Sequence, residues 1–110
     1  MSDKVLIIIS TANEEKARTG VMYCLRTLQE GWLEDAQLVF FGPGEQVLVD
    51  SQEIQEMVKQ IKEVRTPLAC KALSDKADRT AKIEALGVDV VYVGRPISDF
   101  IKQGYVPMVW

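Results

Sequence analysis

The chain alternates short apolar runs with segments of helical periodicity, and this alternation constrains the fold more than any other feature. Residues 5–9 form a continuous run of five apolar, mostly β-branched side chains. Such a run is typical of a strand that is covered on both faces, as in a parallel sheet. Further strands are predicted at residues 36–41, 66–70, 88–93 and 105–110.

Helices are predicted between these strands. The first begins near the capping pair Thr11 and Glu14 and ends at Gly31, and the second begins at the pair Asp50 and Glu53. A third is expected at residues 75–86, and a short fourth begins with Pro96 at its first position. Residues 46–49 are expected to extend the second strand or to form a packed loop.

Alternating strands and helices predict a parallel sheet with right-handed crossovers and helices on both faces. The expected fold class is therefore α/β: a flavodoxin-like, three-layer α/β/α domain that spans residues 1–110. Pro107 lacks the N–H that a central strand needs, so the last strand is expected at an edge. A five-stranded sheet in the order 2-1-3-4-5 satisfies this requirement.

Composition excludes several classes of function. The 110 residues include 13 basic and 16 acidic side chains, and the net charge of −3 argues against a nucleic-acid partner. No apolar stretch is long enough to span a bilayer, so no membrane partner is expected. The amino-terminal residues lack a signal-peptide pattern, and a cytoplasmic location is expected.

The sequence contains no histidine and two cysteines, Cys24 and Cys70. A Ser-His-Asp or Cys-His centre is therefore excluded within one chain. Two distant cysteines do not make a four-ligand zinc site, and neither a metal nor a cofactor is expected.

Cys70 is the candidate catalytic residue. It ends the third predicted strand and lies just before a helix, where free backbone N–H groups favour a thiolate. Lys71 and Arg95 are expected to add positive charge, so the pKa of the thiol is predicted to lie below the free value of about 8.5. The alternative is a buried thiol that serves only as a small apolar side chain. Cys24 lies on the apolar stripe of the first helix and is predicted to be core.

Ligands of such sheets bind beyond the carboxyl ends of the strands, here expected at a switch point between the first and third strands. Polar or glycine residues that follow these ends are therefore predicted to form a binding site around Cys70. They are Ser10, Thr11, Gly42, Gly44, Lys71, Ser74, Gly94 and Arg95.

The second half of the chain resembles the DsrE/DsrF-like (YchN-like) family. The similar features are a strand that ends in Ala-Cys, then residues 86–88, Gly94, a short helix with Phe100 and Ile101, and residues 103–105. The resemblance implies a flavodoxin-like fold, assembly into a homotrimer or homohexamer, and a persulfide on Cys70 that is exchanged with a sulfur donor and a sulfur acceptor protein. Lys71 stands where the family commonly has a small residue.

Three functions are compatible with these patterns. The first is a persulfide carrier or sulfurtransferase-type relay protein that uses Cys70. The second is a non-catalytic module that binds a small molecule or a protein in a cleft at the strand carboxyl ends. The third is a thiol redox sensor in which Cys70 is oxidised to a sulfenic acid.

Overall fold

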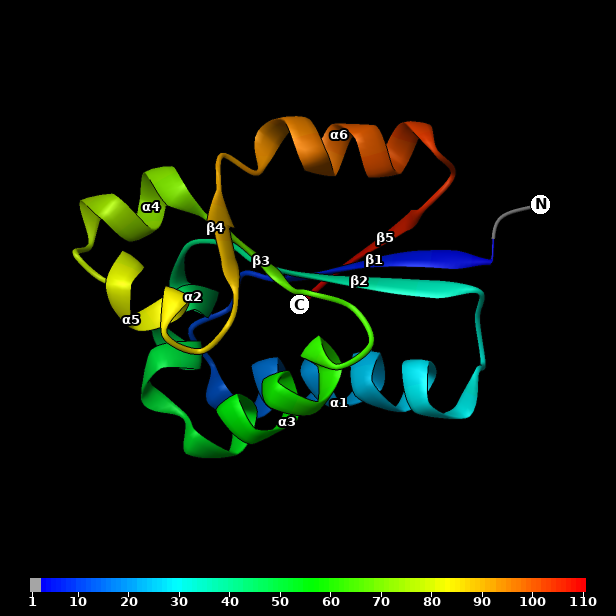
Figure 1. Cartoon of the computed structure of the whole chain (residues 1–110), viewed down its shortest axis with the longest axis horizontal. Coiled ribbons are helices and arrows are strands. Elements are labelled where there is room, and N and C mark those ends of the chain that lie inside the picture. The colour runs from blue at the N-terminus through cyan, green and yellow to red at the C-terminus, as the bar shows by residue number, and fades with distance from the viewer. Residues whose placement is uncertain (1–2) are drawn as a thin grey trace.

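Five parallel strands form one sheet with helices on both faces (Figure 1). The computed structural model describes residues 3–110. The strands are β1 (Lys4–Ile9), β2 (Asp35–Phe40), β3 (Leu68–Cys70), β4 (Asp89–Val91) and β5 (Val106–Val109). The helices are α1 (Glu14–Glu30), α2 (Pro43–Asp50), α3 (Gln52–Lys62), α4 (Lys71–Lys76), α5 (Thr80–Glu84) and α6 (Gly94–Lys102). The predicted fold class, a three-layer α/β/α arrangement, is confirmed.

The strand order is β4-β3-β2-β1-β5, which differs from the predicted 2-1-3-4-5. β2 lies between β1 and β3 instead of at an edge, and β5 pairs with β1 instead of β4. Five of the six residues of β2 are buried, which a strand at an edge does not achieve. β5 does lie at an edge, as predicted from Pro107, which faces Leu6 in the register.

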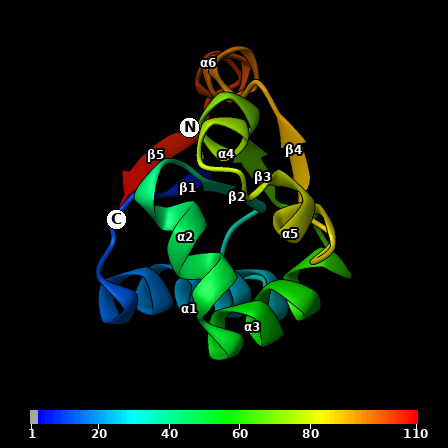
Figure 2. The same ribbon diagram turned by 90° about the vertical axis from the view of Figure 1, so that its left-hand side faces the viewer.

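The order explains which helices lie on which face. The chain passes from β1 to β2, β3 and β4 in one direction, and right-handed connections place α1, α2, α3 and α5 on one face. The short α4, also between β3 and β4, packs through Leu73 against the core on the other face. The return to β5 runs the other way, and α6 lies on the opposite face (Figures 1 and 2).

Each face has its own apolar core. Side chains of α1, α2, α3 and α5 pack on one face, around the fully buried Ile7, Ile9 and Phe40. The smaller core under α6 contains Leu6 and Ile8, with Ile97 and Phe100 packed against it. Cys70 belongs to this smaller core.

Some local predictions hold and others need correction. Gly31 ends α1 with a φ of 65°, as predicted. The helix caps are Asn13 and Ser51 rather than Thr11 and Asp50, because these side chains accept the backbone N–H bonds of the first turns. Pro96 is the third residue of α6, not its first.

Two helical segments differ from the prediction. Residues 46–49 belong to helix α2, which begins with Pro43 directly after Gly42. The helix predicted at residues 75–86 is divided into α4 and α5, and α4 already begins at Lys71. Asp78, between them, has a φ of 56°, a left-handed conformation that interrupts a continuous helix.

Candidate functional site at the carboxyl ends of the strands

Cys70 lies where sequence predicts it, at the end of β3, and it is also the N-terminal cap residue of α4. Its residue surface is 6% exposed, among apolar neighbours of the core under α6. Cys24 is fully buried in the larger core. Burial, and then the charge of Asp35, raise the pKa of the Cys24 thiol to about 12. Cys70 is therefore the more accessible of the two thiols. Its exposed fraction is only slightly larger than that of Cys24, but it lies at the end of a strand, whereas Cys24 lies in the middle of helix α1.

Lys71 follows Cys70, but its charge is already paired. Its Nζ lies 3.1 Å from Oδ2 of Asp75, one turn further along α4. The hydrogen bond and the negative charge of Asp75 raise the pKa of the Lys71 ammonium. The pKa of Asp75 is lowered, first by a hydrogen bond from Thr80 and then by Lys71. The predicted cation next to the thiol is thus half of a surface ion pair.

The two residues after β1 lie further from the thiol than the predicted order implied. The backbone N–H groups of Ser10 and Thr11 donate to the carbonyl oxygen of Trp110, at 2.8 and 3.1 Å. Because β2 separates β1 from β3, two strand spacings, about 10 Å, lie between these segments. Ser10 and Thr11 therefore adjoin β5, and the first and third strands share no switch point.

The predicted glycines have different positions. Gly42 has a φ of 61° and precedes the first turn of α2. At Gly44, a Cβ atom would lie 2.0 Å from the carbonyl oxygen of Ile9, so this position requires glycine for close packing. Gly94 begins α6, where its carbonyl oxygen accepts a hydrogen bond from Ser98.

Of the remaining predicted residues, Ser74 is fully buried and Arg95 is exposed. The Ser74 hydroxyl donates to the carbonyl oxygen of Lys71 at 3.2 Å and lies 2.7 Å from the Thr80 hydroxyl. Ser74 therefore stabilises α4 and its junction with α5. Arg95 lies at the start of α6, on the same edge of the sheet as Cys70.

An apolar hollow of about 460 Å³ lies at the same edge of the sheet as Cys70. We call it the apolar hollow; its lining residues are Ile8, Ser10, Phe41, Gly42, Pro43, Leu73 and Val109. The true switch point of this sheet is between β1 and β5, where the strand order reverses, and the hollow lies at the carboxyl ends of these strands. Ile8 and Leu73 belong both to the hollow and to the core around Cys70. Ser10 and Gly42 are the predicted binding residues that the hollow contains.

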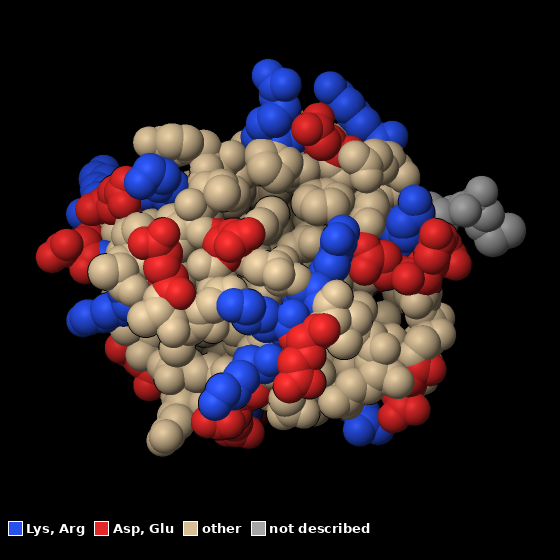
Figure 3. Space-filling model, in the orientation of Figure 1, with Lys and Arg blue, Asp and Glu red and all other residues tan. Residues whose placement is uncertain are grey.

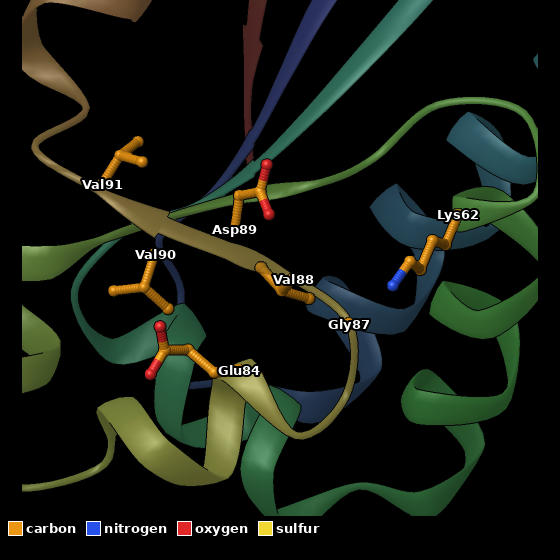
Figure 4. A pocket seen from close by; sticks show the side chains of 7 residues that line it. All are labelled: Lys62, Glu84, Gly87, Val88, Asp89, Val90 and Val91. Carbon is orange, nitrogen blue, oxygen red and sulfur yellow. The ribbon is translucent and has the colours of Figure 1, made fainter.

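A second hollow, of about 310 Å³, follows the edge strand β4 (Figure 4). Its charged lining comes from Lys62, Glu84 and Asp89. Lys62 points toward Gly87, where a Cβ atom would lie 2.5 Å from its Nζ (Figure 4). The hollow lies along the outer edge of the sheet, and one of its lining residues, Val91, is the register partner of Cys70.

Two charged residues that sequence reasoning missed lie under the carboxyl ends of β2 and β3. Glu45 of α2 is fully buried, and its Oε1 lies 3.0 Å from Nη2 of Arg79, a residue in the break between α4 and α5. Burial raises the pKa of the Glu45 carboxyl, against the opposing effects of Arg79 and of the backbone N–H of Cys70. An acidic residue in a first helical turn is ordinary in sequence, so only the three-dimensional packing identifies this pair.

The surface carries both signs of charge. On the face seen in Figure 3, acidic and basic side chains are interspersed with uncharged areas. Among residues 3–110, no three His, Cys, Asp or Glu side chains gather as a metal site would require. Within the same residues, no helix combines the length and apolar character needed to cross a membrane.

The chain is similar in structure to a conserved protein of unknown function from Bacteroides thetaiotaomicron. The TM-score is 0.88 at 22% sequence identity, and the match covers 98% of this chain and 95% of the other. At this identity the likeness shows the fold alone. No protein-family model matches the chain, and no curated protein matches its sequence.

Proposed function

We propose that the chain is a small sulfur carrier that holds sulfane sulfur as a persulfide on Cys70. The observation that carries the proposal is the position of this thiol at the carboxyl end of β3 and the start of α4, in an apolar core that shares Ile8 and Leu73 with the apolar hollow. The resemblance of residues 66–110 to the DsrE/DsrF-like family supports the same role. A reduced thiol persists in the cytoplasm, which is the location we propose.

The chemistry requires one thiolate and no cofactor. The Cys70 thiolate attacks the outer sulfur of a donor R–S–SH and forms a new S–S bond. The S–S bond of the donor breaks, and its inner sulfur leaves as the thiolate R–S⁻. A thiol of the acceptor takes the outer sulfur from Cys70 by the same exchange. The apolar surroundings limit contact of the persulfide with water between these two steps.

Intact mass spectrometry tests the proposal. Incubation of the reduced protein with a small-molecule persulfide is expected to add one sulfur atom per chain, and Cys70→Ser is expected to abolish the addition. Cys24→Ser is the matched control, because it removes the other thiol and leaves the site intact. Absence of the added sulfur, or its retention in Cys70→Ser, would contradict the assignment.

The apolar hollow favours a second candidate, a non-catalytic module that binds an apolar group. Its volume of about 460 Å³ falls within the range of small-molecule sites, roughly 300–1,000 Å³. Phe41 and Val109, which are 36% and 65% exposed, offer apolar surface there. In this case the sulfur donor leaves the mass unchanged, while Phe41→Ala weakens the binding of an apolar fluorescent probe.

A further inference from the structure

The buried Glu45–Arg79 pair links two parts of the chain that flank the thiol. Arg79 donates to Glu45 at 3.0 Å, to the carbonyl oxygen of Gly42 at 2.9 Å and to Oε1 of Gln46 at 3.2 Å. All three acceptors belong to the loop after β2 and to the first turn of α2. The Arg79 side chain is 12% exposed and that of Glu45 is fully buried, so water screens this interaction little.

The backbone of Arg79 also ends the turn that follows α4, the helix that Cys70 caps. Its backbone N–H donates to the carbonyl oxygen of Ser74 at 2.9 Å, where α4 gives way to the left-handed turn at Asp78. The shape of this turn places the guanidinium under the end of β2. The α4 helix is therefore fastened at its far end to another element by the side chain of Arg79.

The near end of α4 faces the same carboxylate. The backbone N–H of Cys70 interacts with Glu45 and favours its charged form. β2 ends at Phe40, whose partner in the register is Ala69, so no β2 strand residue stands opposite Cys70. Glu45 therefore adjoins the start of α4, while Arg79, which follows its far end, forms the ion pair with the same carboxylate.

We propose that Glu45 and Arg79 are positioning residues that hold α4 closed and thereby set the exposure of the Cys70 thiol. With the pair intact, Cys70 is 6% exposed and Leu73 of α4 packs against the core around it. Without the pair, α4 is held by the packing of Leu73 and by the hydroxyl contact of Ser74 with α5, and a six-residue helix with only these tertiary contacts opens more readily. The inference deepens the proposed function, since a carrier must expose its sulfur to a donor and an acceptor, but the geometry itself does not depend on sulfur chemistry.

Alkylation of Cys70 in a Cys24→Ala background tests the proposal, with N-ethylmaleimide as the probe. Arg79→Met is expected to raise the labelling rate at least tenfold. Arg79→Lys keeps the charge but loses the planar fork, and an intermediate rise is expected. The matched control is Arg26→Met, which breaks the exposed pair with Glu30 at 3.3 Å and is expected to leave the rate unchanged.

Urea dependence separates a local opening from global unfolding. A local movement of α4 exposes little surface, so the faster labelling is expected to change little with low urea concentrations. An unchanged rate in both Arg79 variants would overturn the proposal. So would a rise that follows the full urea dependence of global unfolding. If Arg79→Met does not fold, Arg79→Lys decides.

The result is independent of the sulfur-carrier assignment. If Cys70 takes no sulfur but both Arg79 variants expose it, only the proposed function fails. If Cys70 takes sulfur and labelling is unaffected by either variant, only the role of the pair fails.

Discussion

The two thiols of this protein are expected to differ in reactivity by several orders of magnitude. In the native state, a limiting amount of iodoacetamide is expected to alkylate Cys70 and to spare Cys24. Cys24 is fully buried in the larger core, so the reagent cannot reach it, and its raised pKa leaves little of the reactive thiolate.

The magnitude follows from the pKa of Cys24. At about pH 8, a thiol at the reference value of 9.0 is roughly one tenth thiolate, whereas one at about 12 is roughly one part in ten thousand. Ionisation alone therefore slows Cys24 about a thousandfold relative to a free thiol. Access adds a further factor, because a core position opens only with extensive unfolding, whereas the proposed local movement of α4 is enough to expose Cys70.

Peptide mapping after short exposure to the reagent measures this difference. Cys70→Ser is expected to remain unlabelled on the timescale on which Cys24→Ser is completely labelled. Full labelling of both variants in native buffer would indicate that the folded protein opens globally. Preferential labelling of Cys24 would refute the assignment of core and site.

Four further predictions concern stability, assembly and pH. Cys24→Ser is expected to lower the free energy of unfolding by about 1–3 kcal/mol, because a hydroxyl in an apolar core lacks a partner; an unchanged melting temperature would contradict it. Gly44→Ala is expected to cost about 1–3 kcal/mol or more, since its Cβ would lie 2.0 Å from the Ile9 carbonyl oxygen. Gly94→Ala is the control in the same denaturation assay, since nothing lies within 4 Å there. Light scattering at micromolar concentration is expected to give an oligomer, because exposed apolar side chains on β5 favour association, and the resemblance to the DsrE/DsrF-like family implies a trimer or hexamer; a monomer would count against association. Because burial raises the pKa of Glu45, the folded protein binds a proton at this carboxyl more tightly than the unfolded chain does. The resulting stabilisation is complete below the unfolded pKa of 4.5 and is lost as the pH rises through the folded pKa. Glu45→Gln is expected to remove this slope from the pH dependence of the free energy of unfolding, and parallel slopes in the two proteins would refute it.

The fold class was accessible from sequence because it depends on patterns within single segments. Apolar runs such as residues 5–9 predict strands that are buried on both faces, and the Pro107 ring confines the last strand to an edge. Both statements hold in the structure. Each prediction concerns the surroundings of a single segment, and these follow from the periodicity of its side chains and from whether its backbone can form hydrogen bonds.

Strand order was less accessible because parallel strands of similar composition do not specify their neighbours. The predicted and the observed order both place β5 at an edge, and they differ in whether β2 is central. The uninterrupted burial of residues 36–40 favours a central β2, which the alternation pattern alone did not reveal. The division of α4 from α5 occurs at the left-handed Asp78, next to Arg79, whose side-chain partners are more than thirty residues away along the chain.

The candidate site was predictable in its thiol and not in its surroundings. Cys70 could be placed at a strand end from the local pattern, whereas the role of Lys71 depends on the rotamer that pairs it with Asp75. Side chains such as Glu45 become informative only when their burial is known, because a carboxylate in a first helical turn is normally solvated. Residue type and spacing therefore locate reactive atoms better than they locate the groups that control them.

The loop between β2 and α2 contributes both to the apolar hollow and to the hydrogen bonds of Arg79. Gly42 lines the apolar hollow, and its carbonyl oxygen accepts one of the hydrogen bonds that hold Arg79. Its φ of 61° is a conformation that a larger side chain rarely adopts, so the loop keeps its shape only with glycine there. The hollow and the α4 segment share this wall, and they also share Leu73, which lines the hollow and belongs to α4. Exposure of Cys70 by a movement of α4 is therefore expected to change the hollow as well. Arg79→Met is expected to raise the labelling of Cys70 and to weaken probe binding, whereas Phe41→Ala is expected to weaken probe binding alone.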